Sequence, residues 1–190
     1  MNPILKWLVI GQLSAVVWLQ AFMYTLRPHE YSFLGDDYPQ IWTINHGIQE
    51  QVATPFENSV HFTFDSVMSE AEWESQVPHR GLIQLGKYRQ TFSISMFHQL
   101  RCISLVRSDI IKRRSSNYTT NISPLTGHCL NYLRQMALCR ADIDLESVLL
   151  VPNPEAHPSK YRCTNWNLIY EATLENHRMH PGSNFEVDRK

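Results

Sequence analysis

The stretch that decides the fold runs from Thr91 to Arg113 and reads TFSISMFHQLRCISLVRSDIIKR. Its apolar residues recur every three or four positions, which is the period of an α-helix with one buried face. The stretch is also longer than a strand of a globular protein normally is. We therefore predict a long amphipathic helix, whose buried stripe consists of Phe92, Met96, Phe97, Leu100, Ile103, Val106 and Ile110.

A second helix is predicted from Leu125 to Arg140, because Cys129, Leu133, Met136 and Ala137 form one stripe and Pro124 suits a first turn. Three prolines between Val151 and Pro158 predict a loop. A last helix is expected to begin at a Thr164 cap. Its apolar side would carry Trp166, Ile169, Tyr170, Leu174 and His177.

The region before the first helix shows weaker patterns. Alternation of apolar and polar residues from Val60 to Phe64 predicts a half-buried strand. Ser69 and Glu72 resemble a capping box that opens a short helix ending before Pro78, and Gly81 with Gly86 marks a turn-rich connection. The predicted fold class is therefore mainly α with a small β element, built around two long helices.

The N-terminus carries 20 residues without a charge, from Trp7 to Leu26, between Lys6 and Arg27. A helix of that length just spans a hydrocarbon core about 30 Å thick. We predict a transmembrane helix over residues 7–26, with residues 1–6 as a short cytoplasmic tail. A cleavable signal peptide is the alternative, but the exit from Phe22 to Leu26 lacks the small residues that cleavage needs, which favours an uncleaved anchor.

Two features predict that the rest of the chain is luminal. Asn117-Tyr118-Thr119 and Asn121-Ile122-Ser123 are glycosylation sequons in a polar stretch, so Asn117 and Asn121 are candidate acceptors. Four cysteines also suit an oxidising lumen. We expect a single-pass protein of the secretory and endomembrane system, with an extended juxtamembrane segment over residues 27–54 and one luminal domain over residues 55–190.

Charge excludes one class of partner. Lys and Arg number 17 against 18 Asp and Glu, for a formal net charge of -1. A nucleic-acid-binding domain would show a basic excess or stripe, so no nucleic-acid partner is expected.

The two long helices each place a histidine near a cysteine. His98, Arg101 and Cys102 share a face of the first helix, and His128 precedes Cys129 in the second. If the helices pack side by side, His98 and His128 converge, and imidazole is a common ligand of copper, zinc and iron. The competing interpretation is structural, since a histidine on an amphipathic helix is more often a hydrogen-bonded core or surface group.

The cysteines favour two disulfides over thiolate ligands, because they are even in number and the domain is expected to be luminal. Spacing alone does not determine the connectivity. We expect Cys102 to pair with Cys129 and Cys139 with Cys163. Arg101 and Arg134 are candidates for binding an anion, or for pairing with a carboxylate such as Asp142 or Asp144.

The motifs resemble those of the UstYa-like proteins of fungi. The resemblance rests on Ser95-Met96-Phe97-His98-Gln99-Leu100-Arg101-Cys102, on His128-Cys129-Leu130-Asn131-Tyr132-Leu133-Arg134-Gln135 with Cys139, and on Arg162-Cys163 before Trp166. It implies a membrane-anchored tailoring protein of fungal secondary-metabolite (mycotoxin) biosynthesis. The family signature is a pair of His-x-x-His-Cys motifs, whose histidines the resemblance implies to bind copper.

Both motifs of this chain depart from that signature. Arg101 stands where the second histidine of the first motif is expected, and Leu125 where the first histidine of the second motif is expected. Neither side chain can serve as a ligand, so only His98 and His128 are left as metal candidates. A site with more histidines requires other members of the chain to converge on the pair: His61, His79, His157, His177 or His180.

Two functions of different class follow from the resemblance. The first is a tailoring oxidase acting on a peptide or other natural product by oxidative cyclisation, hydroxylation, desaturation or halogenation, with one copper held by His98, His128 and a third histidine. The second needs no metal. In it, Arg101 and the histidines act as acid-base or oxyanion groups in a cyclisation or isomerisation, or the chain is a non-catalytic partner of a complete paralogue in a hetero-oligomer.

Overall fold

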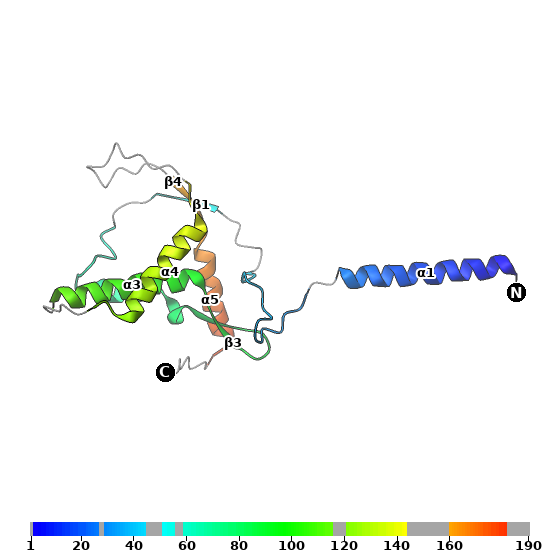
Figure 1. Ribbon diagram of the computed structural model, residues 1–190, viewed down its shortest axis with the longest axis horizontal. Coiled ribbons are helices and arrows are strands. Elements are labelled where there is room, and N and C mark those ends of the chain that lie inside the picture. Colours follow the sequence, from blue (N-terminus) through cyan, green and yellow to red (C-terminus); the bar gives the residue numbers. More distant parts are fainter. Residues whose placement is uncertain are drawn as a thin grey trace. The chain divides into compact units, whose positions relative to one another are not determined.

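The computed structural model describes residues 2–26, 29–44, 51–55, 59–115, 121–143 and 160–181. Within these ranges the chain is mainly helical, with two small antiparallel sheets, which confirms the predicted class (Figure 1). The chain divides into two compact units, residues 1–38 and 39–190.

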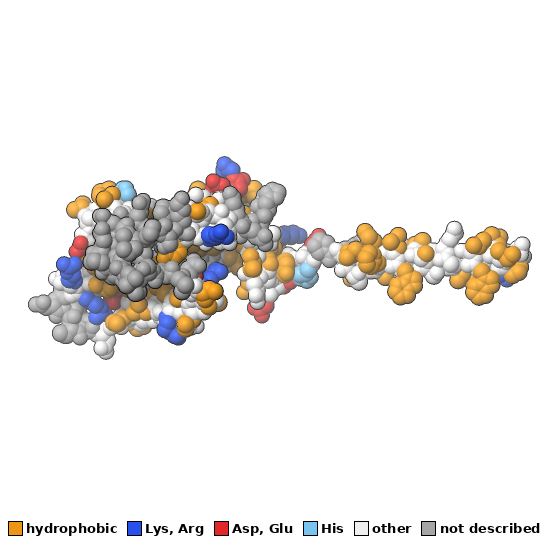
Figure 2. All heavy atoms as spheres, turned by 90° about the horizontal axis from the view of Figure 1, so that it is seen from above, with side chains coloured by type: hydrophobic (Ala, Val, Ile, Leu, Met, Phe, Trp, Pro, Cys, Tyr) orange, Lys and Arg blue, Asp and Glu red, His pale blue; other side chains and the backbone are white. Residues whose placement is uncertain are grey.

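Helix α1 (Pro3–Thr25) forms most of the first unit, and none of its residues is buried. It begins before the predicted residue 7, because Pro3 is well suited to a first helical turn. Figure 2 shows apolar side chains along its whole length. The helix is long and apolar enough to cross a membrane, and an N-terminal signal sequence would share these properties.

Residues 29–44 contain turns and bends without a helix or strand, and 45–50 lie outside the described residues. The Asp37 carboxylate accepts a hydrogen bond from the Ser32 N–H at 2.8 Å and contacts His29 Nε2 at 3.1 Å. These bonds, first those with Ser32 and then that with His29, lower the pKa of Asp37 to about 2.

The second unit is built around α3 (Ser95–Ser115) and α4 (Pro124–Arg140), which cross in Figure 1. Ser123 caps α4 by accepting a hydrogen bond from the Thr126 N–H at 3.1 Å. Both predicted helices are confirmed, but α3 begins at Ser95 and not at Thr91. The preceding residues form β3 (Gln90–Ser93), which pairs with β2 (Leu82–Leu85) in a hairpin.

This hairpin replaces the predicted turn-rich connection, and Gly81 fixes its start. Gly81 has φ +71°, and a Cβ at this position would overlap with the Phe97 side chain, which is fully buried. Only glycine combines this backbone conformation with such a close approach. Phe97 also meets Tyr170 edge to face, with ring centroids 5.1 Å apart.

Helix α5 (Asn167–Met179) packs against this hairpin and the short turn η1 (Pro78–Gly81). The Asn176 side chain accepts from the Gln84 N–H at 2.9 Å and donates to the Gln84 carbonyl at 2.8 Å. The predicted apolar face is partly wrong, because Thr173 and Asn176 are the buried residues and Leu174 is exposed. Favourable hydrogen bonds to the hairpin outweigh apolar periodicity here.

The predicted start of this helix at Thr164 is also wrong. Thr164 ends β4 (Lys160–Thr164), which pairs antiparallel with β1 (Gln51–Pro55). The pairing joins segments more than 100 residues apart in sequence, which local patterns do not reveal.

The predicted strand from Val60 to Phe64 is wrong, because this segment bends around α2 (Ser69–Ser75). The Glu72 carboxylate accepts from the Phe62 N–H at 2.8 Å and contacts His61 Nδ1 at 2.8 Å. Glu72 is thereby diverted from the predicted capping box, and the Ser69 hydroxyl donates to the Ser66 carbonyl.

Arg107 ties this segment to α3 from a buried position. Its guanidinium donates to the Phe64 carbonyl at 2.7 Å, to the Ser69 hydroxyl at 2.6 Å and to the Glu70 carboxylate at 2.9 Å. A buried charge is stable only when its donors are satisfied in this way.

Candidate functional site

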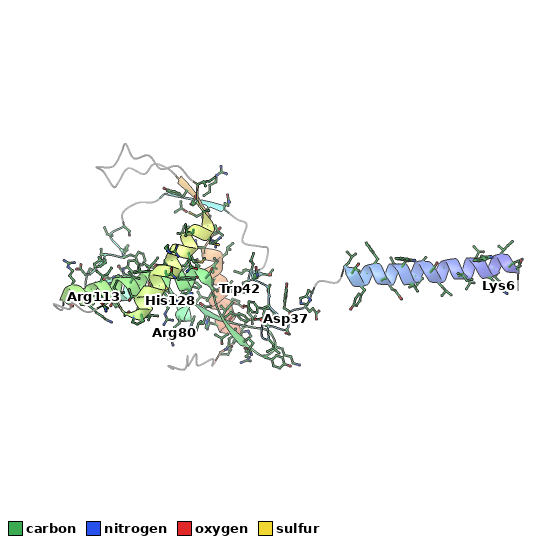
Figure 3. The ribbon with its side chains drawn as sticks, in the orientation of Figure 1. Lys6, Asp37, Trp42, Arg80, Arg113 and His128 are labelled. Atoms are coloured by element: carbon green, nitrogen blue, oxygen red, sulfur yellow. A yellow bond between two sulfur atoms is a disulfide. The ribbon has the colours of Figure 1, made fainter. Side chains whose placement is uncertain are left out.

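His98 of α3 and His128 of α4 have their rings next to each other. Figure 3 labels His128, which lies where the two helices cross. The ring centroids of the two histidines are 6.4 Å apart and their planes are 21° from parallel. A disulfide between Cys102 and Cys129, as expected, joins the helices beside this pair, with Cα atoms 5.0 Å apart. The structure therefore brings together the two histidines that the spacing predicted to converge.

Tyr132 supports the pair from α4, one turn after His128. Its ring stacks on His98 with centroids 4.2 Å apart and planes 20° from parallel. In the sequence, Tyr132 stood out only as part of the motif that begins at His128. Its spacing of four from His128 was the signal that could have placed it at the site.

The ring nitrogens of both histidines are available. Among the described residues, neither the His98 ring nor the His128 ring makes a hydrogen bond. Burial, followed by the nearby His128 and Arg101, lowers the pKa of His98 below its ordinary value of 6.5. His98 is therefore neutral at neutral pH, which is the form that ligates a metal.

The pair fits a shared metal ion by chemistry and by separation. An imidazole nitrogen lies about 2 Å from a bound transition metal, so two rings on one ion have centres about 5 to 6 Å apart. The observed 6.4 Å is close to that range. No cluster of three His, Cys, Asp or Glu suited to a metal occurs in the described part of the chain, so the pair supplies two nitrogens.

Other histidines are engaged elsewhere. His61 contacts Glu72, and His79 stacks on His177 with centroids 3.8 Å apart and planes 16° from parallel. His177 Nε2 donates to the Leu82 carbonyl at 2.6 Å. His180 lies just beyond α5, and His157 is outside the described residues. None of the described ones joins His98 and His128 in a three-residue cluster.

Arg101 and Leu125 occupy positions at the edge of this site. Arg101 is exposed one turn after His98, and its charge contributes to the lowered pKa of that histidine. Leu125 is 56% exposed in the first turn of α4, three residues before His128.

The second predicted disulfide is wrong. Cys139 and Cys163 are both free thiols, with Cys139 exposed in the last turn of α4 and Cys163 paired opposite Val52 in the β1–β4 sheet. Of the two sequons, Asn121 is exposed and Asn117 lies outside the described residues. Asp142 lies just after α4, Asp144 is not described, and Arg134 donates to the Asn131 side chain at 3.1 Å.

A family model described as mycotoxin biosynthesis protein UstYa matches residues 53–173, more than half of the chain. The chain belongs to the UstYa family. The matched range of this UstYa family chain includes both helices of the site and the whole of β4.

Two curated relatives are similar in sequence to parts of this UstYa family chain. The UstYa family oxidase phomYb of Diaporthe leptostromiformis is 29% identical over 98 residues, which cover 52% of the chain and 37% of the relative. Oxidase ustYa of Aspergillus flavus is 39% identical over 64 residues, which cover 34% of the chain and 30% of the relative. The chain thus spans about a third of the length of each relative, 37% and 30%. No solved structure matches it.

Proposed function

We propose that this UstYa family chain is a tailoring oxidase of mycotoxin biosynthesis that uses one copper ion at His98 and His128. The observation that carries the proposal is the pairing of these rings, 6.4 Å apart, without hydrogen bonds to described residues and on helices joined by a disulfide. Two relatives that bear the name oxidase support the redox assignment.

Each residue of the pair has a distinct task. His98 is held by the Tyr132 stack and kept neutral by its surroundings, so it presents a lone pair from a fixed orientation. His128 is exposed and presents its ring from the opposing helix. Copper, when bound, supplies one-electron redox chemistry. Because these residues furnish two donors, positions around the ion are open to a third histidine of the chain or to substrate.

Family membership supports a proposed substrate class. We propose a peptide or other small natural product, which undergoes oxidative cyclisation, hydroxylation, desaturation or halogenation. The exposed side of the site, with Arg101 and His128 at its edge, suits a substrate that approaches from solvent.

Helix α1 supports a proposed membrane location. We propose that it is an uncleaved anchor and that residues 39–190 are luminal, where the Cys102–Cys129 disulfide is stable. Endoglycosidase treatment of the chain from a eukaryotic host tests this topology. A mobility shift that is lost in Asn117→Gln/Asn121→Gln supports it, while an unglycosylated chain with a protease-accessible domain on the cytosolic side contradicts it.

Elemental analysis of the purified full chain in detergent tests the copper assignment. We expect about one copper per chain, lost in His98→Ala and in His128→Ala. His79→Ala is the matched control, because it removes a paired histidine of the same unit outside the site. A correctly folded chain that oxidises its substrate without copper contradicts the proposal.

The two departures of this chain from the family signature, Arg101 and Leu125, favour a second function. Arg101 and Leu125 leave half of the signature histidines, and the described residues supply no third ligand. This supports a non-redox role, either acid-base cyclisation or isomerisation through Arg101 and the histidines or partnership with a complete paralogue. Activity that survives copper removal, or appears only when a paralogue is added, would favour this function.

A further inference from the structure

Arg101 is a guanidinium without a partner in the described part of the chain. It makes no hydrogen bond or ion pair there, although Arg107, Arg113 and Arg114 of the same helix are all paired. Arg101 is also exposed, so its five donors face solvent beside His98. An arginine in this setting is free to bind an external acceptor.

The two helices of the site also lack acidic side chains that could neutralise Arg101. Helix α3 contains five basic residues and one acidic residue, Asp109, which pairs with Arg113 at 3.0 Å. Helix α4 contains two basic residues and no acidic one. Arg101 therefore adds a positive charge to the site that no acidic residue of these two helices offsets. The site therefore favours a negatively charged ligand.

We propose that Arg101 binds a carboxylate of the substrate and so places the adjoining atoms of that substrate at the His98–His128 pair. This inference rests on the proposed function, because it names the substrate class of the same site. A guanidinium matches a carboxylate with two parallel hydrogen bonds, which orients as well as attracts the ligand.

One fixed cation favours a carboxylate over a phosphate. Phosphate sites normally surround the dianion with several positive groups or a helix N-terminus. His98 and Arg101 lie in the first two turns of α3, and the His98 N–H donates to the Ile94 carbonyl at 3.0 Å, so this backbone donor is already used. A singly charged carboxylate is the better match to Arg101.

Arg101 lies close enough to His98 for a bound carboxylate to position the rest of the substrate. Arg101 is one turn from His98, about 5 to 6 Å between Cβ atoms in a helix, so a carboxylate held there brings its α- and β-carbons beside the imidazoles. Arg101 thus stands in place of a histidine of the family signature, and this position binds substrate where the signature would place a metal ligand. Arg101 is in this account a binding residue, and His98 and His128 retain the ligand role.

Titration of the full chain in detergent micelles with benzoate, followed by NMR of ¹³C-labelled histidine, tests the proposal. We expect benzoate to shift the His98 and His128 signals, because it binds one helical turn away from His98. Arg101→Gln should weaken benzoate binding about five- to tenfold and Arg101→Lys by less, since lysine keeps the charge but loses the paired geometry. Benzamide, the neutral analogue, should not bind measurably.

Equal benzoate affinity in the wild type and Arg101→Gln, tighter binding of inorganic phosphate than of benzoate, or equal binding of benzamide would each overturn the proposal. Copper titration of the same samples distinguishes failure of the carboxylate site from failure of the proposed function. Copper binding without Arg101-dependent benzoate binding overturns the carboxylate site alone. Arg101-dependent benzoate binding without copper overturns the copper oxidase and leaves the carboxylate site in place.

Discussion

The second unit brings two pairs of histidines together, and the two pairs differ in structure. The rings of His98 and His128 have centroids 6.4 Å apart, and their nitrogens make no hydrogen bond to described residues. His79 and His177 stack at 3.8 Å, and His177 is bonded to the Leu82 carbonyl. At 3.8 Å the His79 and His177 rings are in van der Waals contact, which leaves no room for an ion between them. Proximity of histidines therefore does not by itself make a metal site, and the proposed copper site depends on the wider separation and the unbonded ring nitrogens of His98 and His128.

Of the substitutions that distinguish the two histidine pairs, removal of the Cys102–Cys129 disulfide should have the largest effect. Cys102→Ser/Cys129→Ser deletes a link that closes 27 residues, which we expect to lower the free energy of unfolding by about 3 to 4 kcal/mol. Copper binding should fall with it, because α3 and α4 are then held by packing alone. Denaturant unfolding and copper titration measure both effects. Cys139→Ser is the control, since that exposed thiol is free and its loss should change stability by less than about 0.5 kcal/mol.

Asn176→Ala should affect the other pair selectively. The substitution removes two hydrogen bonds that hold Gln84 of β2 to α5, beside the His79–His177 stack. We expect a loss of about 2 kcal/mol in unfolding free energy with copper binding at His98 and His128 unchanged. A loss of copper in a folded Asn176→Ala chain would show that the two pairs are not independent.

Acidification should weaken the fold modestly through both pairs. Burial, then the charge of a neighbouring histidine, lowers the pKa of His79 and of His98 below 6.5. The unfolded chain therefore binds more protons than the folded one just below pH 6.5. The stabilisation is complete above pH 6.5 and is lost as pH falls through the two lowered pKa values. Thermal unfolding as a function of pH checks this, and stability that increases on acidification over this range contradicts it.

The smallest expected effect is a change in the pKa of a histidine in one pair and not in the other. Arg101→Gln should raise the pKa of His98, because a positive neighbour is removed, and should leave that of His79 unchanged. Histidine NMR titrations of the variant and the wild type give both values. An unchanged pKa of His98 would mean that Arg101 does not act on the site.

The sequence predicted those parts of the molecule that depend on local periodicity. Helix α4 and most of α3 follow from apolar spacing and capping, and the approach of His98 to His128 follows from placing a His and a Cys close together on each of two neighbouring helices. The Cys102–Cys129 pairing agreed with that arrangement.

The errors arose where distant polar groups decide the structure. The strand expected from Val60 to Phe64 is prevented by hydrogen bonds from Phe62 to Glu72 and from Arg107 to Phe64. The β1–β4 pairing and the Asn176 contacts with Gln84 likewise join segments far apart in the chain. Residue spacing contains no signal for such contacts, and for the same reason the stack of His79 on His177 was not foreseen.

The central claim is that His98 and His128 hold one copper with two imidazole nitrogens. Pulsed electron paramagnetic resonance of the copper(II)-loaded full chain counts those nitrogens directly. We predict two coupled imidazoles in the wild type, one in His128→Ala, two in His79→Ala, and three in Arg101→His, which restores a histidine of the signature. Two imidazoles that persist unchanged in His98→Ala or His128→Ala would place the copper elsewhere and contradict the account.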